Sequence, residues 1–353
     1  MWKYVVKRLL LALLTAFIIL SLTYLMMKLL PFQRPIGMAT EQWRYYEAQV
    51  DYGYVIKFTT QKEGFGELLF TTEGTSIGVD GEGNYLYYYQ RPILEQYFNF
   101  WGNVITKWDW GTSTAIHFNA TAMSIIASRL PVTVSINIWS VLFSVPAGIA
   151  LGIWAALKKN KPTDHIISTV VMIFISVPSF IVISLLIKWL AFDLKLFPGS
   201  WPDAKSTGQN KFLGYFIPVL ALSFGSICGY CRFTRAELCE VMSSDYLLLA
   251  RTKGLTKTQC ITRHALRNAM VPIVPSILAE FIGILSGSMI LENLYNIPGI
   301  GSLFVTSINA KDYSVLMVDM AMFTLISLTA SVFLDISYGF IDPRSRMGAK
   351  NNG

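Results

Sequence analysis

Residues able to do covalent chemistry are few in this chain of 353 residues, and they are scattered along it. The three histidines, His117, His165 and His264, are separated by long apolar stretches, and no H-E-x-x-H zinc motif occurs. No Gly-Lys dipeptide is present, so the chain has no Walker A loop to hold nucleotide phosphates. The sequence therefore predicts no catalytic residue, no metal site and no cofactor bound by this chain.

Two acidic residues stand out because they lie within long apolar runs. Glu280 interrupts the run from Ala269 to Leu291, and Asp319 lies in the run from Tyr313 to Leu334. Burying an ionised carboxylate inside a membrane is costly, so such groups usually face a partner or a polar pathway. Both residues are candidates for a pathway through the membrane. The alternative for each is a structural hydrogen bond between helices.

A basic segment between two apolar runs has the pattern of a docking surface. It reads Asp245-Tyr246-Leu247-Leu248-Leu249-Ala250-Arg251-Thr252-Lys253-Gly254-Leu255, followed by Arg263-His264-Ala265-Leu266-Arg267-Asn268-Ala269. Helical periodicity on both sides of Gly254 predicts two short helices that meet at a bend. Contact with anionic lipid would explain the basic residues, but not the glycine or the leucines. Apolar residues flanked by charge favour protein docking. The candidate docking residues are Asp245, Tyr246, Leu249, Ala250, Arg251, Lys253, Gly254, Leu255, His264 and Arg267.

The elements that must position these residues are membrane helices. Hydrophobic residues make up 53% of the chain and charged residues only 14%, against about 25% charged in a typical soluble domain. The net charge of +7 does not indicate nucleic-acid binding, because the basic residues flank apolar runs on alternate sides. Four cysteines lie in or after the fourth run, and Cys228-x-x-Cys231 lacks a second pair at zinc-site spacing. No disulfide framework is expected.

Six apolar runs are long enough to span a bilayer, which requires about 20 residues. They are Leu9–Leu30, Val132–Leu157, Ile166–Ile187, Phe212–Cys231, Ala269–Leu291 and Tyr313–Leu334. The first lacks a signal-peptide cleavage site, so we expect an uncleaved helix. Basic residues gather after the second, fourth and sixth runs, which places both termini and the basic segment in the cytoplasm. The fold class is therefore an all-α polytopic membrane protein with six transmembrane helices.

The long segment between the first two runs predicts a small extracellular α+β insert. Residues 33–128 carry ten acidic and six basic residues and are rich in aromatics. Glycine-rich turns separate β-prone runs at Glu67–Thr72 and Asn84–Gln90. The predicted organisation is a first helix at 1–31, the insert at 32–128, a five-helix core at 129–346 and a tail at 347–353. Within the core, the cytoplasmic loop covers about 237–268.

Several motifs resemble those of a known family. Ala250-Arg251-Thr252-Lys253-Gly254-Leu255 with residues 263–269 resembles the EAA loop in the peptide-importer branch of ABC permeases, although only Ala250, Gly254 and Leu266 match the general EAA pattern. The remaining matching motifs are Arg129-Leu130-Pro131-Val132-Thr133, Ser176-Val177-Pro178-Ser179-Phe180, Trp110-Gly111-Thr112-Ser113, Glu292-Asn293-Leu294-Tyr295, Pro298-Gly299-Ile300-Gly301, Asp312-Tyr313 and Asp342-Pro343-Arg344. Together they resemble the B-type permease of bacterial dipeptide and oligopeptide ABC importers.

The resemblance implies a heteromeric importer in the bacterial plasma membrane with the type I ABC importer permease fold. This chain would pair with a second, related permease subunit, and two cytoplasmic ABC ATPases would bind ATP and Mg. An extracellular peptide-binding lipoprotein would deliver oligopeptides. Residues 245–262 would form the coupling helix that sits in a groove of one ATPase. The outer loop looks longer than is common in the family, with the excess around Tyr52–Gln90.

Three alternatives remain open from the sequence. The same architecture serves other cargo, such as nickel, haem or another small solute. A secondary transporter would use Glu280 and Asp319 as ion sites and would show an inverted repeat, which the six runs do not display. A receptor or scaffold would bind an external ligand through the insert without accumulating it.

Overall fold

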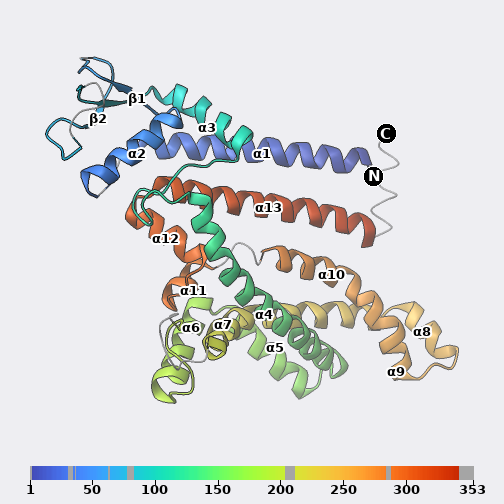
Figure 1. Cartoon of the computed structure of the whole chain (residues 1–353). Coiled ribbons are helices and arrows are strands. Elements are labelled where there is room, and N and C mark those ends of the chain that lie inside the picture. Colours follow the sequence, from blue (N-terminus) through green and yellow to red (C-terminus); the bar gives the residue numbers. More distant parts are fainter. Residues whose placement is uncertain are drawn as a thin grey trace. The chain divides into compact units, whose positions relative to one another are not determined.

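The computed structural model describes residues 2–30, 35, 37–62, 64–77, 83–202, 211–283 and 288–341 (Figure 1). Most of the described residues are helical, and they contain one small sheet. The chain forms two compact units. Unit 1 comprises Met1–Ala12, Pro131–Ser302 and Leu325–Gly353, and unit 2 comprises Leu13–Leu130 and Leu303–Thr324.

Four helices in the described part of the chain are long and apolar enough to cross a membrane. They are α1 (Trp2–Leu29), α4 (Ala122–Leu157), α7 (Lys211–Met242) and α13 (Tyr313–Ile341). A fifth candidate consists of α5 (Pro162–Ile175) and α6 (Ser179–Leu186), the latter continued by the π-helical turn η1 (Ile187–Asp193). Its two halves are bent by 98°. Four to five spans are therefore observed where six were expected.

The break in the third expected span has a clear local cause. Pro178 is the N-cap of α6, and its φ and ψ of −59° and 140° are not helical. Proline lacks the N–H that would continue the preceding helix, and it disfavours helical geometry in the residue before it. The fifth expected span is covered in part by α10 (Leu266–Gly283) and α11 (Met289–Leu294). Residues 284–287, which would join them, lie outside the described residues.

In unit 1, close helix packing centres on α7. Gly148 and Gly152 of α4 face its backbone: a Cβ on Gly148 would lie 2.8 Å from the Ile227 carbonyl oxygen, and one on Gly152 would lie 2.6 Å from that of Cys231. This small-x-x-x-small spacing allows two helices to approach closely. An ion pair links α5 to α7: Asp164 is fully buried and accepts from Nη2 of the partly exposed Arg235 at 2.8 Å.

In unit 2, a three-stranded antiparallel sheet packs against a helix through aromatic side chains. Its strands are β1 (Val55–Phe58), β2 (Leu68–Thr71) and β3 (Tyr87–Gln90), in the order β1-β3-β2. Helix α2 (Ala39–Asp51) supplies Tyr45 and Tyr46, which share a buried cluster with Tyr88 of β3. The α+β content of this segment agrees with the sequence, and both expected strands are present. No run expected from the sequence corresponds to β1.

Helix α3 (Ile93–Lys107) follows α1 closely within unit 2 (Figure 1). Lys28 Nζ donates to Gln96 Oε1 at 2.7 Å at one end of this contact, and the rings of Phe17 and Trp101 lie 4.7 Å apart at the other. The two contacts are eleven residues apart on α1, which is about 16 Å along a helix. Helix α3 therefore lies along the apolar span of α1, although it belongs to the segment expected to be extracellular.

Candidate functional site

The basic loop of unit 1 folds as two short helical segments joined at Gly254. Helix α8 (Asp245–Thr252) ends there, and α9 (Lys257–Gln259) and the π-helical turn η2 (Cys260–Ala265) then lead into α10. Gly254 has φ of +88°. Its N–H donates to the Arg251 carbonyl at 3.0 Å, and the Leu255 N–H donates to the Ala250 carbonyl at 3.4 Å. These two bonds form a Schellman motif, which requires a left-handed residue. The bend expected from the sequence is therefore present.

One face of α8 is buried and the other is open. Leu247 and Ala250 pack in a buried cluster with residues of α4, α7 and η2, including Ala156, Leu238 and Cys260. The neighbouring Leu248 and Leu249 are 64% and 57% exposed. The same short helix thus uses one pair of apolar residues to anchor the loop and presents a second pair outward.

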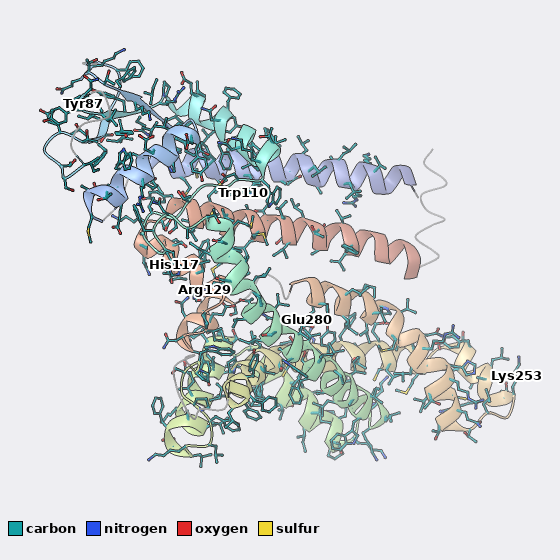
Figure 2. All side chains as sticks on the ribbon, in the orientation of Figure 1. Tyr87, Trp110, His117, Arg129, Lys253 and Glu280 are labelled. Carbon is teal, nitrogen blue, oxygen red and sulfur yellow. The ribbon has the colours of Figure 1, made fainter. Side chains whose placement is uncertain are left out.

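The charged candidates of the loop are exposed. Arg251 lies in the last turn of α8, Lys253 is the C-cap of that helix, and Figure 2 shows Lys253 at the tip of the loop. Asp245, His264 and Arg267 are also exposed. Tyr246 is 41% exposed, and its hydroxyl accepts a hydrogen bond from Asn268 Nδ2 at 2.8 Å. Ala250 is buried, so it serves the anchor rather than the outward face.

The two acidic candidates from the apolar runs have different surroundings. Glu280 of α10 is half-buried and accepts a hydrogen bond from Ser226 Oγ of α7 at 2.5 Å. This contact is the interhelical bond that was the structural alternative for Glu280. Asp319 of α13 is fully buried. Glu280 belongs to unit 1 and Asp319 to unit 2.

A third acidic residue, Glu292, holds the start of another helix in unit 1. It is 3% exposed; its Oε1 accepts from Thr133 Oγ1, and its Oε2 accepts from the Ser302 N–H, both at 2.9 Å. Ser302 lies in the first turn of α12 (Ile300–Ala310), where unpaired N–H groups favour a carboxylate. A Cβ on Gly299 would collide with the carboxylate.

A fourth buried acid, Asp312, plays a similar part in unit 2. Its Oδ2 accepts the backbone N–H groups of Thr114, Ala115 and Ile116 at 3.1 to 3.2 Å, together with the hydroxyl of Ser113. Asp312 precedes the first residue of α13, so its side chain fixes a distant loop at that helix start. The sequence indicated Ser113 and Asp312 only as parts of separate motifs.

The sequence also contains a serine-nucleophile motif that is not among the candidate sites predicted above. Gly74-Thr75-Ser76-Ile77-Gly78 matches G-x-S-x-G, in which a serine nucleophile sits on a strand-to-helix turn. Residues 72–77 form turns after β2, and the next described element is β3 rather than a helix. The described context of Ser76 therefore differs from the one this chemistry needs.

Comparison with known proteins gives consistent matches. The family of binding-protein-dependent transport system inner membrane components matches residues 148–347. The dipeptide transport system permease protein DppB of Lactococcus lactis is 34% identical over 347 residues, which is 98% of this chain and all of that protein. The Bacillus subtilis protein of the same name is 31% identical, covering 78% of this chain and 87% of its own length.

A second group of relatives carries the name of another transport system. The oligopeptide transport system permease protein OppB of Salmonella typhimurium is 29% identical over 98% of this chain and its own full length. Among solved structures, the inward-facing MetNI methionine ABC transporter matches 61% of this chain and 97% of its own, at 17% identity and a TM-score of 0.46. The chain belongs to the family of binding-protein-dependent transport system inner membrane components.

Proposed function

We propose that this chain is the permease subunit of an ABC importer that moves oligopeptides into the cell. The observation that carries the proposal is the full-length similarity to permeases named for dipeptide and oligopeptide transport. The outward apolar pair on α8 adds a physical reason, because a transport subunit without its own nucleotide site needs a surface for a motor protein.

In the proposed mechanism, α8 docks in a groove of a cytoplasmic ABC ATPase, and ATP and Mg bind to the ATPase subunits. Leu248 and Leu249 would enter the groove, with Arg251 and Lys253 at its rim. The buried residues Leu247 and Ala250 join α8 to the cluster with α4 and α7. Movement of the docked helix would therefore be transmitted to the helices. Each state must make different contacts for ATP to switch between them.

The remaining components follow from the same proposal. Six helices would span the plasma membrane with both termini in the cytoplasm, and a second permease subunit would complete the pathway. The sheet and α2 of unit 2 would lie outside, where a peptide-binding lipoprotein delivers substrate. Glu280 and Asp319 are proposed to influence the pathway, since an ionisable group within a membrane helix usually serves function.

Uptake of labelled di- to octapeptides tests the proposal directly. Cells lacking this chain would be compared with cells in which it is restored, with and without ATP depletion. We expect restored accumulation that collapses when ATP is depleted. A Leu248→Glu/Leu249→Glu variant should reach the membrane normally yet fail to co-purify with ATPases, because charge would replace the apolar docking pair.

Two results would change the proposal. Peptide uptake that is unaffected by loss of the chain, while ATPases still co-purify with it, would retain the importer and exclude peptide cargo. Uptake that follows an ion gradient and survives loss of the ATPases would instead support a secondary transporter.

A further inference from the structure

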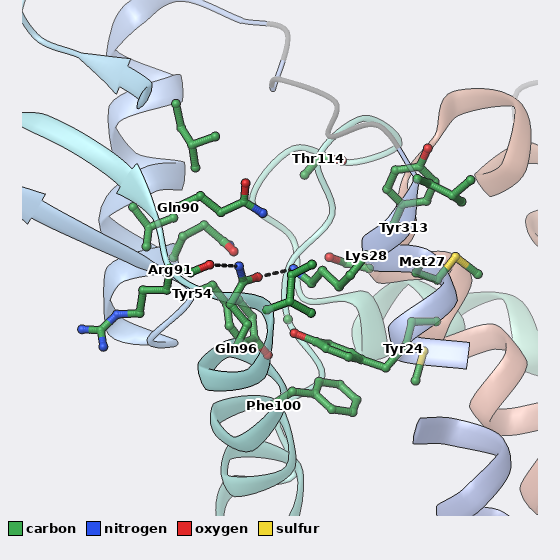
Figure 3. Close-up of a pocket in the computed structure, with 18 of the residues that line it drawn as sticks. Tyr24, Met27, Lys28, Tyr54, Gln90, Arg91, Gln96, Phe100, Thr114 and Tyr313 are labelled. Carbon is green, nitrogen blue, oxygen red and sulfur yellow. Dashed lines mark hydrogen bonds between the residues drawn. The ribbon is translucent and has the colours of Figure 1, made fainter. Parts of the chain in front are cut away.

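Unit 2 contains a cavity of about 550 Å³ that the docking loop and the acidic candidates do not explain. It is lined by the end of α1, by α2, by residues next to the three strands, by the start of α3 and by the first turn of α13 (Figure 3). Cavities of 300 to 1,000 Å³, in approximate terms, are typical of sites for small molecules.

The cavity wall is largely aromatic and aliphatic. The apolar lining includes Tyr24, Tyr54, Phe65, Phe100, Trp110 and Met317. Such a wall favours a ligand with an apolar body, because burying apolar surface stabilises the complex by about 25 cal/mol per Å².

A lysine ammonium lies at the polar side of the cavity. Lys28 Nζ donates to Gln96 Oε1 at 2.7 Å, and Gln96 Nε2 in turn donates to the Arg91 carbonyl at 2.6 Å (Figure 3). The same ammonium lies 5.1 Å from the ring centre of Tyr54 and 5.5 Å from that of Tyr24. An ammonium has three donors. The two aromatic rings stabilise the positive charge of Lys28 at the edge of the cavity.

The Tyr24 hydroxyl and the Trp110 indole N–H are further polar groups of the lining that are buried without a hydrogen-bond partner among the described residues. Tyr24 and Trp110 are each only 5% exposed. The tryptophan N–H only donates, and the tyrosine hydroxyl can donate. An unpaired buried group costs about 1–3 kcal/mol, so two in one cavity require an explanation.

The charged residues of the described lining also favour a negatively charged ligand. Lys28, Arg91 and Lys311 contribute three positive charges, and Glu67 contributes one negative charge. Arg91 also pairs with Glu95 at 3.3 Å through Nη1, and Figure 3 shows its guanidinium turned away from Lys28. Donors and positive charge together select an acceptor that is negatively charged.

We propose that this cavity binds an anionic group, a carboxylate or a phosphate, carried on an apolar chain. The anion lies against Lys28, Tyr24 Oη and Trp110 Nε1, and the apolar chain lies along the aromatic wall. Two sources have this chemistry: the C-terminal carboxylate of a peptide and the headgroup of an anionic lipid. The peptide source rests on the proposed function, whereas the lipid source is independent of it.

Binding of simple amphiphiles to the purified full-length chain tests the proposal. The chain is placed in phosphatidylcholine nanodiscs and titrated with octanoate and octyl phosphate, with octylamine and octanol as probes of equal length. We expect both anions to bind about tenfold more tightly than the amine or the alcohol, which corresponds to about 1.4 kcal/mol. Equal binding of octanoate and octylamine would overturn the proposal.

Variants identify the cavity as the site. Lys28→Met should weaken octanoate binding at least about tenfold, and Lys28→Arg should restore most of it, since charge-assisted bonds contribute more than neutral ones. Lys107→Met is the matched control, because this exposed lysine of α3 does not belong to the cavity lining. If Lys28→Met and Lys107→Met both bind octanoate as the unmodified chain does, the site is elsewhere and the proposal fails.

Tyr24→Phe provides a readout that does not depend on a charge change. It removes only the buried hydroxyl, so it should raise the melting temperature without ligand and weaken octanoate binding several-fold. A lower melting temperature with unchanged binding would show that the hydroxyl is paired within the protein, which contradicts the proposal.

Competition separates the two sources. A short peptide with a free C-terminal carboxylate is compared with its C-terminal amide, and phosphatidylglycerol replaces part of the phosphatidylcholine. Displacement of octanoate by the free acid alone identifies a peptide terminus, whereas displacement by phosphatidylglycerol identifies a lipid. Failure of peptide uptake in cells would leave the lipid result intact, so the two proposals can fail separately.

Discussion

Substitution of Gly254 tests whether the bend of the docking loop is set by its backbone. A Cβ at this position would meet no atom within 4 Å, so there is room for a larger side chain. The φ of +88° is nevertheless disfavoured for residues with a Cβ. Strain of this kind costs about 1–2 kcal/mol. The sequence predicts a bend at Gly254, and the structure shows that the backbone conformation there, rather than crowding within this chain, limits which residues can replace the glycine.

Hydrogen exchange in the loop provides the direct assay. In Gly254→Val, the N–H groups of Leu255 and of position 254 should exchange about 5 to 30 times faster, which corresponds to the 1–2 kcal/mol lost. Asparagine tolerates left-handed geometry better than valine does, so Gly254→Asn should change exchange far less. Peptide uptake should fall in the same order, because a distorted bend misplaces Leu248 and Leu249.

A matched control separates loop strain from strain in general. Gly74 of unit 2 also has positive φ, at +72°, and a Cβ there would also meet no atom within 4 Å. Gly74→Val should therefore carry a similar local cost and leave ATP-driven uptake unchanged. Wild-type exchange at residues 254 and 255 in Gly254→Val would refute the reasoning, as would equal losses of uptake in the valine and asparagine variants.

Three further expectations concern stability and exposure. Asp312→Ala should lower the free energy of unfolding by about 3 kcal/mol or more, since several donors lose their shared acceptor. Ser113→Ala should lower it by only about 1 kcal/mol. Equal losses of stability in the two variants, measured by thermal unfolding, would contradict this. Asp164→Ala should cost about 2 kcal/mol, because its arginine partner is partly exposed, whereas Glu95→Ala in an exposed pair should cost at most about 1 kcal/mol. In membranes, a water-soluble maleimide should label Glu95→Cys much faster than Ile105→Cys, because α3 follows the apolar span of α1; comparable rates would place Ile105 in water.

Local sequence signals predicted the local structure well. Alternating β-prone residues marked β2 and β3, and Gly254 between two helical patterns marked the bend of the loop. Apolar runs marked the long helices, although α4 begins at Ala122 rather than at Val132. That helix continues through Pro131, which shows that a proline within a helical pattern does not always end the helix.

The features that sequence reasoning missed depend on contacts between distant residues. Pro178 lies within one continuous apolar run, and hydropathy does not distinguish a straight helix from one bent by 98°. Gly148 and Gly152 carry a helix-packing motif whose partner backbone, in α7, is known only from the fold. The exposed face of α3 is apolar, with Leu94 68% and Phe98 70% exposed. Composition alone does not show that α3 lies beside α1.

The buried carboxylates explain why separate motifs of this chain depend on one another. Glu292 bonds to Thr133, which is 159 residues away, and Asp312 bonds to Ser113, which is 199 residues away. In each case a carboxylate of one motif accepts a hydrogen bond from a hydroxyl of another motif, and it also accepts backbone N–H groups at the start of a helix or in a loop. These hydrogen bonds form only after distant segments have come together. The sequence of a single motif therefore does not show which residues its donors and acceptors bond to. Thr133→Val should therefore perturb the start of α12 as strongly as a change made within α12 itself, because the Thr133 hydroxyl also accepts the Ile300 N–H at 3.0 Å.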